Sequence, residues 1–114
     1  MSLNPESRWN DFFAIMTGHA AGRFRDVDVR SPEEWRAGHV EGSVNVPLEK
    51  IDTVGEFFPA GTSLLVYGRN EAESSAAKEK LKESGYGDVI AVPGSFEELV
   101  ARTPTLPVKR GSEP

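Results

Sequence analysis

Cysteine is absent from this chain of 114 residues. Its absence excludes disulfide bonds, thiolate metal sites and every thiol nucleophile. Long apolar runs are absent too, since the longest, 12–16 and 64–67, are far too short to span a bilayer. The first residues also lack the basic and then apolar pattern of a secretory signal. We therefore expect a cytoplasmic protein, and no spacing of side chains predicts a metal or another cofactor.

Positive charge is in the minority, with 13 lysine and arginine residues against 18 aspartate and glutamate residues and a net charge of −5. Such a surface repels phosphate backbones and anionic lipids, so we expect binding to neither nucleic acid nor membranes. The length predicts one domain, residues 1–114, with enough buried surface to fold without disulfide or metal staples. No pattern indicates an oligomeric state.

Five segments carry the spacing or the capping residues of helices. Asn4 and Ser31 each precede a proline at the first helical position, and Ser31 and Ser95 both open capping boxes. The aromatic stripe of the first helix is interpreted as core packing rather than as a binding surface. The expected helices run from Pro5 to about Gly18, Pro32 to Gly38, Ile51 to Phe58, Glu71 to Ser84 and Phe96 to about Arg102.

Strands are expected between these helices, at Phe24–Val29, Ser43–Val46, Ser63–Tyr67 and Val89–Val92. The third of them is apolar almost throughout, which is typical of a central parallel strand buried on both faces. Strands that alternate with helices predict an α/β fold with an open parallel sheet covered on both sides. The tail, residues 103–114, is expected to be extended.

Residues 28–47 hold several features in a fixed order. An Asp-Val-Arg triplet at 28–30 precedes the short capped helix, and Gly-His-Val at 38–40 and Asn-Val-Pro at 45–47 follow it. This order resembles the N-terminal signature of rhodanese domains. The second half is similar to that family as well, with an apolar strand, a loop, an alanine-bearing helix, and a last strand and helix. The resemblance covers residues 24–100 and implies a rhodanese-like α/β domain with a five-stranded, mostly parallel sheet and helices on both faces.

The departure from the family lies in the loop after the third expected strand. The resemblance implies Cys-Arg-x-Gly-x-Arg-Ser there in active members, whereas this chain has Gly68-Arg69-Asn70-Glu71-Ala72-Glu73-Ser74. Gly68 therefore occupies the position of the nucleophilic cysteine. Sulfur transfer in the family proceeds through a persulfide on that cysteine, and glycine has no side chain to hold it. The resemblance thus implies that no catalytic residue remains for the family's route.

The loop and the strand end beside it define a candidate vestigial pocket: Gly68, Arg69, Asn70, Glu71, Ala72, Glu73, Ser74, Asp28 and Arg30. Asp28 and Arg30 are expected to form an ion pair under the loop. One arginine and two glutamates give the loop a net negative charge, which disfavours the anions that the family's loop captures. Asn70 and Glu73 have N-cap and N3 spacing, so we expect the Glu73 carboxylate to reach back to the helix start in place of an anion. Both glutamates are explained by a well-capped helix, and the competing interpretation is an acidic recognition loop.

Two histidines and one tryptophan are weaker candidates. We interpret His39 as forming a structural hydrogen bond near the sheet rather than acting as a general base. His19 follows a glycine at a helix end, where a solvent-facing role or an interaction with the helix dipole is usual. Trp35 is expected to cover the core rather than to present a recognition platform.

Two classes of function stay open. The favoured one is a catalytically inactive rhodanese-like domain that acts as a binding or regulatory module, linked to sulfur metabolism by the family resemblance. Its acidic loop would favour a protein partner with a basic segment over an anionic sulfur donor. The alternative is a sulfurtransferase-related enzyme that uses other pocket residues or a partner's cysteine.

Overall fold

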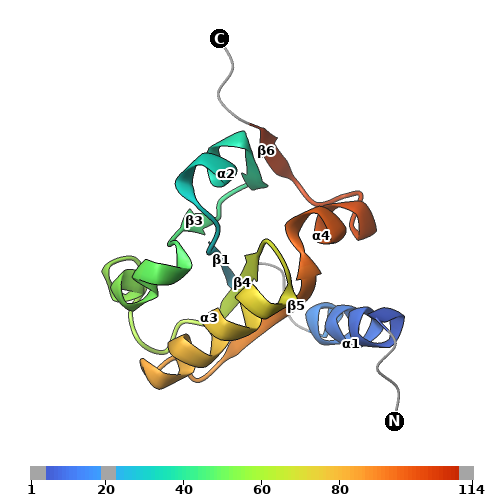
Figure 1. Ribbon diagram of the computed structural model, residues 1–114. Helices are drawn as coiled ribbons and strands as arrows, with labels where there is room; N and C mark the ends of the chain where they lie inside the picture. Colours follow the sequence, from blue (N-terminus) through green and yellow to red (C-terminus); the bar gives the residue numbers. More distant parts are fainter. Residues whose placement is uncertain (1–4, 19–22, 111–114) are drawn as a thin grey trace.

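The structure is a computed structural model, and it describes residues 5–18 and 23–110. Its centre is a parallel sheet of four strands in the order β3-β1-β4-β5 (Figure 1). These strands are β1 (Arg25–Asp28), β3 (Val44–Asn45), β4 (Leu64–Gly68) and β5 (Val89–Ser95). Parallel neighbours require crossover connections, and the helices between the strands supply them. The predicted α/β class with a mostly parallel sheet is confirmed.

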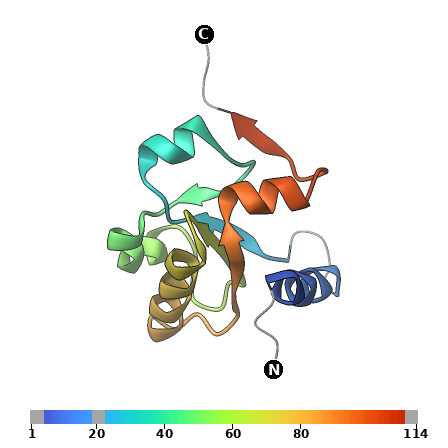
Figure 2. The same ribbon diagram turned by 45° about the vertical axis from the view of Figure 1, so that its right-hand side comes forward.

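Helices cover both faces of this sheet (Figure 2). One side carries α3 (Glu71–Glu83) and the 3₁₀ helix η1 (Leu48–Glu56), and the other carries α1 (Pro5–Thr17) and α4 (Phe96–Arg102). All five residues of β4 are buried, and its side chains alternate between the two cores. Leu64 and Val66 pack with α3 and η1, whereas Leu65 and Tyr67 pack with α1 and α4. β4 is therefore the doubly buried central strand that its apolar sequence predicts.

A two-stranded antiparallel ribbon stands apart from the main sheet. β2 (Gly38–Val40) follows α2 (Pro32–Ala37), and β6 (Val108–Arg110) pairs with it. The expectation of a five-stranded sheet is wrong for the described residues, where the main sheet has four strands. The chain beyond α4 joins β2 instead of the main sheet, so part of the expected extended tail is held by strand pairing.

The helix η1 differs from the helix expected at Ile51–Phe58. It begins at Leu48, ends at Glu56 and has 3₁₀ geometry, with a kink at Lys50 (φ −118°, ψ 21°). Short 3₁₀ segments are common in connections between larger elements. Of the four residues that suggested a helix, Ile51 and Val54 are buried in the core and Phe58 packs against it, whereas Phe57 is exposed. The apolar pattern therefore located the buried face of this segment but not its helix type.

The other helices begin and end within one residue of their predicted bounds, and both predicted capping boxes are present. The expected cap at Asn4 lies outside the described residues. Among the four strands that the sequence predicted, only β5 departs by more than one residue, because it continues through Pro93 to Ser95. No helix within 5–18 or 23–110 is long and apolar enough to cross a membrane.

Candidate functional site

The candidate pocket lies where β1 and β4 end. These strands are parallel neighbours, with Asp28 opposite Tyr67, so their carboxyl ends meet at one edge of the sheet. α2 follows β1 and α3 follows β4, which brings the starts of both helices to this edge. Ligand sites of parallel α/β sheets form outside the carboxyl ends of the strands. The residues that the sequence singled out therefore lie at the edge where such sites occur.

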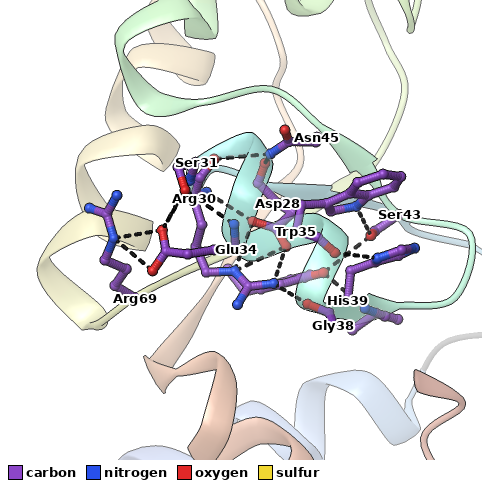
Figure 3. Close-up of polar contacts among 12 residues, drawn as sticks. Asp28, Arg30, Ser31, Glu34, Trp35, Gly38, His39, Ser43, Asn45 and Arg69 are labelled. Carbon is purple, nitrogen blue, oxygen red and sulfur yellow. Dashed lines mark hydrogen bonds and ion pairs between the residues drawn. The ribbon is translucent and has the colours of Figure 1, made fainter. Parts of the chain in front are cut away.

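Asp28 and Arg30 form the predicted ion pair under the loop (Figure 3). Arg30 Nη2 donates to Asp28 Oδ2 at 2.7 Å, and the backbone N–H of Arg30 donates to Oδ1 at 2.8 Å. Arg30 also donates to the carbonyl of Gly38 at 2.5 Å, and its guanidinium lies 4.1 Å from the ring centroid of Phe96. The side chains of Arg30 and Asp28 are only 5% and 0% exposed. Since both Asp28 oxygens accept from Arg30, this carboxylate serves the ion pair rather than a ligand.

The Glu73 carboxylate fills the space beside Gly68. Its Oε1 accepts the backbone N–H of Arg69 at 2.7 Å, and its Oε2 accepts from Arg69 Nη1 at 2.7 Å. A Cβ atom placed on Gly68 would lie 2.7 Å from Glu73 Oε1, 2.9 Å from Glu73 Cβ and 3.1 Å from Val29 Cγ2. Non-bonded heavy atoms attract at about 3.5–4.0 Å and repel at such shorter distances. Position 68 therefore accepts a larger residue only if Glu73 moves.

Arg69 joins the loop to α2. Its Nε donates to both oxygens of Glu34, at 2.8 and 3.0 Å, while its Nη1 bonds Glu73. The hydrogen bond that Arg69 donates to Glu34, and then the charge of Glu73, raise the pKa of Arg69. Glu34 also accepts the backbone N–H of Ser31 at 3.1 Å in the capping box of α2. The sequence showed only this capping role of Glu34, because its contact with Arg69 depends on how α2 and the loop pack.

The start of α3 is capped as predicted. Asn70 Oδ1 accepts the backbone N–H of Glu73 at 2.9 Å. The Glu73 carboxylate reaches back as expected, but it bonds the N–H of Arg69, one residue before the cap. Ser74 is buried, and its hydroxyl donates to the carbonyl of Val92 at 2.7 Å, which ties α3 to β5.

The remaining loop residues face outward. Glu71 forms an ion pair with Arg8 of α1, a contact that sequence reasoning missed, and Ala72 is exposed. Among the described residues, every carboxylate of the loop is thus already paired with an arginine. The net charge of the loop predicts an acidic surface. In the fold Arg8 brings a positive charge to Glu71, whereas Glu34 brings a further negative charge to Arg69, so the loop's charges are paired but their local sum stays negative.

Aromatic and hydroxyl groups form a network beside the buried ion pair (Figure 3). The rings of Trp35 and His39 stack with centroids 3.8 Å apart, and His39 Nδ1 donates to the Trp35 carbonyl at 2.6 Å. Trp35 Nε1 and the Tyr67 hydroxyl both donate to Ser43 Oγ, each at 3.1 Å. Burial, helped by the charge of Asp28, raises the pKa of Tyr67, so its hydroxyl stays protonated. The structural hydrogen bond predicted for His39 is confirmed. The partly buried Trp35 stacks on His39 and bonds Ser43, and it packs against neither core cluster of the described residues.

Two further expectations concern histidine and metal. His19 lies outside the described residues. In the part of the chain that the structure describes, no group of three His, Asp or Glu side chains is placed to hold a metal ion.

Together, the parallel sheet, its two helical layers and the loop after β4 define an α/β domain with a site at the carboxyl edge of the sheet. The family model described as "Rhodanese-like domain" matches residues 18–102. That match covers most of the chain, so the chain belongs to the rhodanese-like family.

Individual relatives agree with this assignment. The chain is similar to thiosulfate sulfurtransferase PspE of Escherichia coli (strain K12), with 35% identity over 65 residues, which is 55% of this chain and 62% of that relative. The chain thus spans less than two thirds of that protein. Among solved structures, the rhodanese-like domain of the Alr3790 protein from Anabaena has a TM-score of 0.71 at 23% identity, covering 80% of this chain and 96% of that one. A structure titled "rhodanese with anions from E. coli" has a TM-score of 0.65 at 29% identity, covering 76% of this chain and 98% of that one.

Proposed function

We propose that this rhodanese-like domain is catalytically inactive and acts as a binding or regulatory module. The observation that carries the proposal is the state of the nucleophile position, where Gly68 has no side chain and the Glu73 carboxylate takes the space beside it. The family's persulfide route needs a thiolate at this point, and the chain has no cysteine. A fixed carboxylate also opposes the approach of an anionic sulfur donor.

An enzyme that uses other pocket residues or a partner's cysteine is the alternative, and the site's hydrogen bonds weigh against it. The Asp28 carboxylate is bonded to Arg30, and the Ser74 hydroxyl donates to a backbone carbonyl. A thiolate from a partner would meet the Glu73 carboxylate beside Gly68. Like charges at such short range raise the pKa of a thiol and lower its reactive fraction. We therefore favour the binding module.

The partner in this proposal is a protein with a basic segment, met in the cytoplasm. A net charge of −5 favours cationic over anionic partners. The link to sulfur metabolism is part of the proposal as well, and it rests on the similarity to a relative named as a thiosulfate sulfurtransferase.

The direct test is a sulfur-transfer assay with thiosulfate and cyanide, using the Escherichia coli relative as positive control. We expect no turnover above that of the boiled chain in cysteine-free buffer. We also expect no mass gain of one sulfur atom after incubation with thiosulfate. Either turnover or a sulfur adduct would reject the inactive module.

Restoring the thiol tests why the site is inactive. Gly68→Cys alone is expected to transfer sulfur very weakly, because the new side chain competes with Glu73 for space and Glu73 raises its pKa. Adding Glu71→Gly and Glu73→Arg is expected to give clearly more activity. Gly68→Ser in both backgrounds is the matched control, since it has nearly the same size and no thiol. Equal activity of the single and triple variants would show that the loop glutamates do not block the site.

A further inference from the structure

A groove lies between η1 and the C-terminal half of α3, on the face of the sheet away from α1 and α4. Its volume is about 360 Å³. Leu48 and Ile51 supply apolar surface, and Glu49, Asp52 and Glu83 supply three carboxylates beside Lys80. Ligand pockets in proteins span about 300–1,000 Å³, so the groove is large enough to take one or two side chains of a bound segment.

The carboxylates of the groove are free, unlike those of the loop after β4. Glu49, Asp52 and Glu83 are exposed, and none of them has an ion pair or a side-chain hydrogen bond among the described residues. At the loop, by contrast, Glu73 and Glu71 are both held by arginines. A cation that docks on the loop must displace an internal arginine, whereas a cation that docks in the groove displaces only water.

One lining residue of the groove, Glu49, acts electrostatically on the loop. Besides Glu34 and Glu73, the charge of Glu49 contributes to the raised pKa of Arg69. Charges affect one another in this way only over short distances in water and salt.

Arginine fits this combination of surfaces better than other cations do. Its long apolar stem can lie along Leu48 and Ile51 while its planar head binds carboxylates by two parallel hydrogen bonds. We infer that the groove between η1 and α3 binds an arginine-bearing segment of a partner protein. The inference rests on the proposed binding function and names the surface at which the partner docks.

The test uses a short peptide of alternating arginine and alanine with both ends capped. Its control is the same peptide with citrulline in place of arginine, which keeps the shape and removes the charge. Titration of the isotope-labelled chain, followed by amide NMR, is expected to shift signals of η1 and the second half of α3 with the arginine peptide only. The affinity is expected to fall as salt rises, because exposed charges are screened.

Two charge reversals of equal size locate the site. Asp52→Lys/Glu83→Lys is expected to weaken binding at least about tenfold. Asp11→Lys/Glu41→Lys changes the net charge equally at exposed positions outside the groove, so its affinity is expected to stay within about twofold of the wild type. Asp52→Asn/Glu83→Gln repeats the test without adding positive charge, and thermal unfolding verifies the fold of each variant.

The inference would be overturned by equal weakening in both reversals, by equal binding of the citrulline peptide, or by no binding of the arginine peptide at all. If binding is instead lost in Glu71→Lys/Glu73→Lys and kept in the groove variants, the loop is the interface. In that case the groove is rejected while the proposed binding function stands, because the sulfur-transfer assay judges catalytic inactivity separately.

Discussion

The neighbouring strands β1 and β4 end at the same edge of the sheet, yet the two ends hold charge in opposite ways. After β1, the Asp28–Arg30 pair is almost fully buried. After β4, Arg69 is 51% exposed and is shared between Glu34 and Glu73. Buried pairs are costly to break, whereas exposed pairs add little to stability. The buried pair after β1 therefore stabilises the fold. The exposed charges after β4 can change, and with them binding and reactivity, without unfolding the domain.

A second comparison lies along β1 itself. Asp26 and Asp28 are two residues apart and so share a face of the strand. Asp28 has Arg30 as its partner, while Asp26 has no hydrogen bond or ion pair among the residues that the structure describes. Burial alone raises the pKa of Asp26 to about 6. The strand therefore contains a fully buried carboxylate with a counterion and a partly buried carboxylate without one among the described residues.

The largest effect is expected from Asp28→Ala. It leaves the Arg30 guanidinium buried without its counterion, which typically costs about 3–5 kcal/mol. Urea unfolding monitored by circular dichroism measures the loss. Asp28→Leu/Arg30→Met removes both charges and is expected to be more stable than Asp28→Ala alone. A loss below about 1 kcal/mol for Asp28→Ala would place this pair in the same class as the exposed pairs of the loop.

Asp26→Asn is expected to stabilise the folded chain at neutral pH, whereas Asp28→Ala destabilises it. The folded-state pKa of Asp26, about 6, lies above its ordinary value of 3.8, so the folded state holds this proton more tightly than the unfolded state. The stabilisation by the proton is complete below pH 3.8 and is lost as the pH rises through about 6. A shift of this size corresponds to at most about 3 kcal/mol of unfolding free energy.

Asp26→Asn removes the carboxyl group that titrates, so the stability of this variant relative to the wild type should improve between pH 4 and pH 7. Unfolding free energies measured across that range, with Asp11→Asn as an exposed control, give the difference directly. A constant difference between variant and wild type at all pH values would mean that Asp26 titrates normally in the folded chain.

Gly68→Ala is expected to cost on the order of 2 kcal/mol, since a methyl group there overlaps the Glu73 side chain. The same change in a Glu73→Ala background is expected to cost much less, because the overlapping carboxylate is gone. The double-mutant cycle therefore measures how strongly Glu73 closes the site. Equal costs in the two backgrounds would indicate that Val29 or the backbone, and not Glu73, limits position 68.

Local signals in the sequence predicted much of the fold. The caps at Ser31, Asn70 and Ser95 fixed the starts of three helices, because a cap is decided by residues within one turn. The Asp28–Arg30 pair was predictable for the same reason, since its members are two residues apart. The pairing of β6 with β2 was not, because it depends on where the chain after α4 meets a strand far back in the sequence.

The site shows the same division. Most residues of the site were predicted from the sequence, but the ion pairs that they form with distant residues were not. Arg69 binds Glu34 across 35 positions, and Arg8 binds Glu71 across 63, and no periodicity or motif encodes such contacts. Arg8 brings a countercharge to Glu71, whereas Glu34 brings a further carboxylate to Arg69, so the loop's charges are paired although their local sum stays negative. The summed charge of a segment therefore does not show which of its charged side chains are paired in the fold.

The smallest effect is expected at the cap of α3. Asn70 Oδ1 accepts the N–H of Glu73, and Asn70→Ala removes this bond, which typically costs about 1 kcal/mol. Asn70→Ser is the matched control, because a serine hydroxyl also caps and should keep most of the stability. The same bond orders the first turn of α3, from which Glu73 reaches Arg69. Asn70→Ala should therefore also speed hydrogen exchange at the Arg69 and Glu73 amides, while the exchange of β4 amides stays unchanged. An unchanged urea midpoint together with unchanged exchange would mean that the ion pair alone keeps Glu73 against Arg69. The arrangement of the exposed charges after β4 would then not depend on the cap.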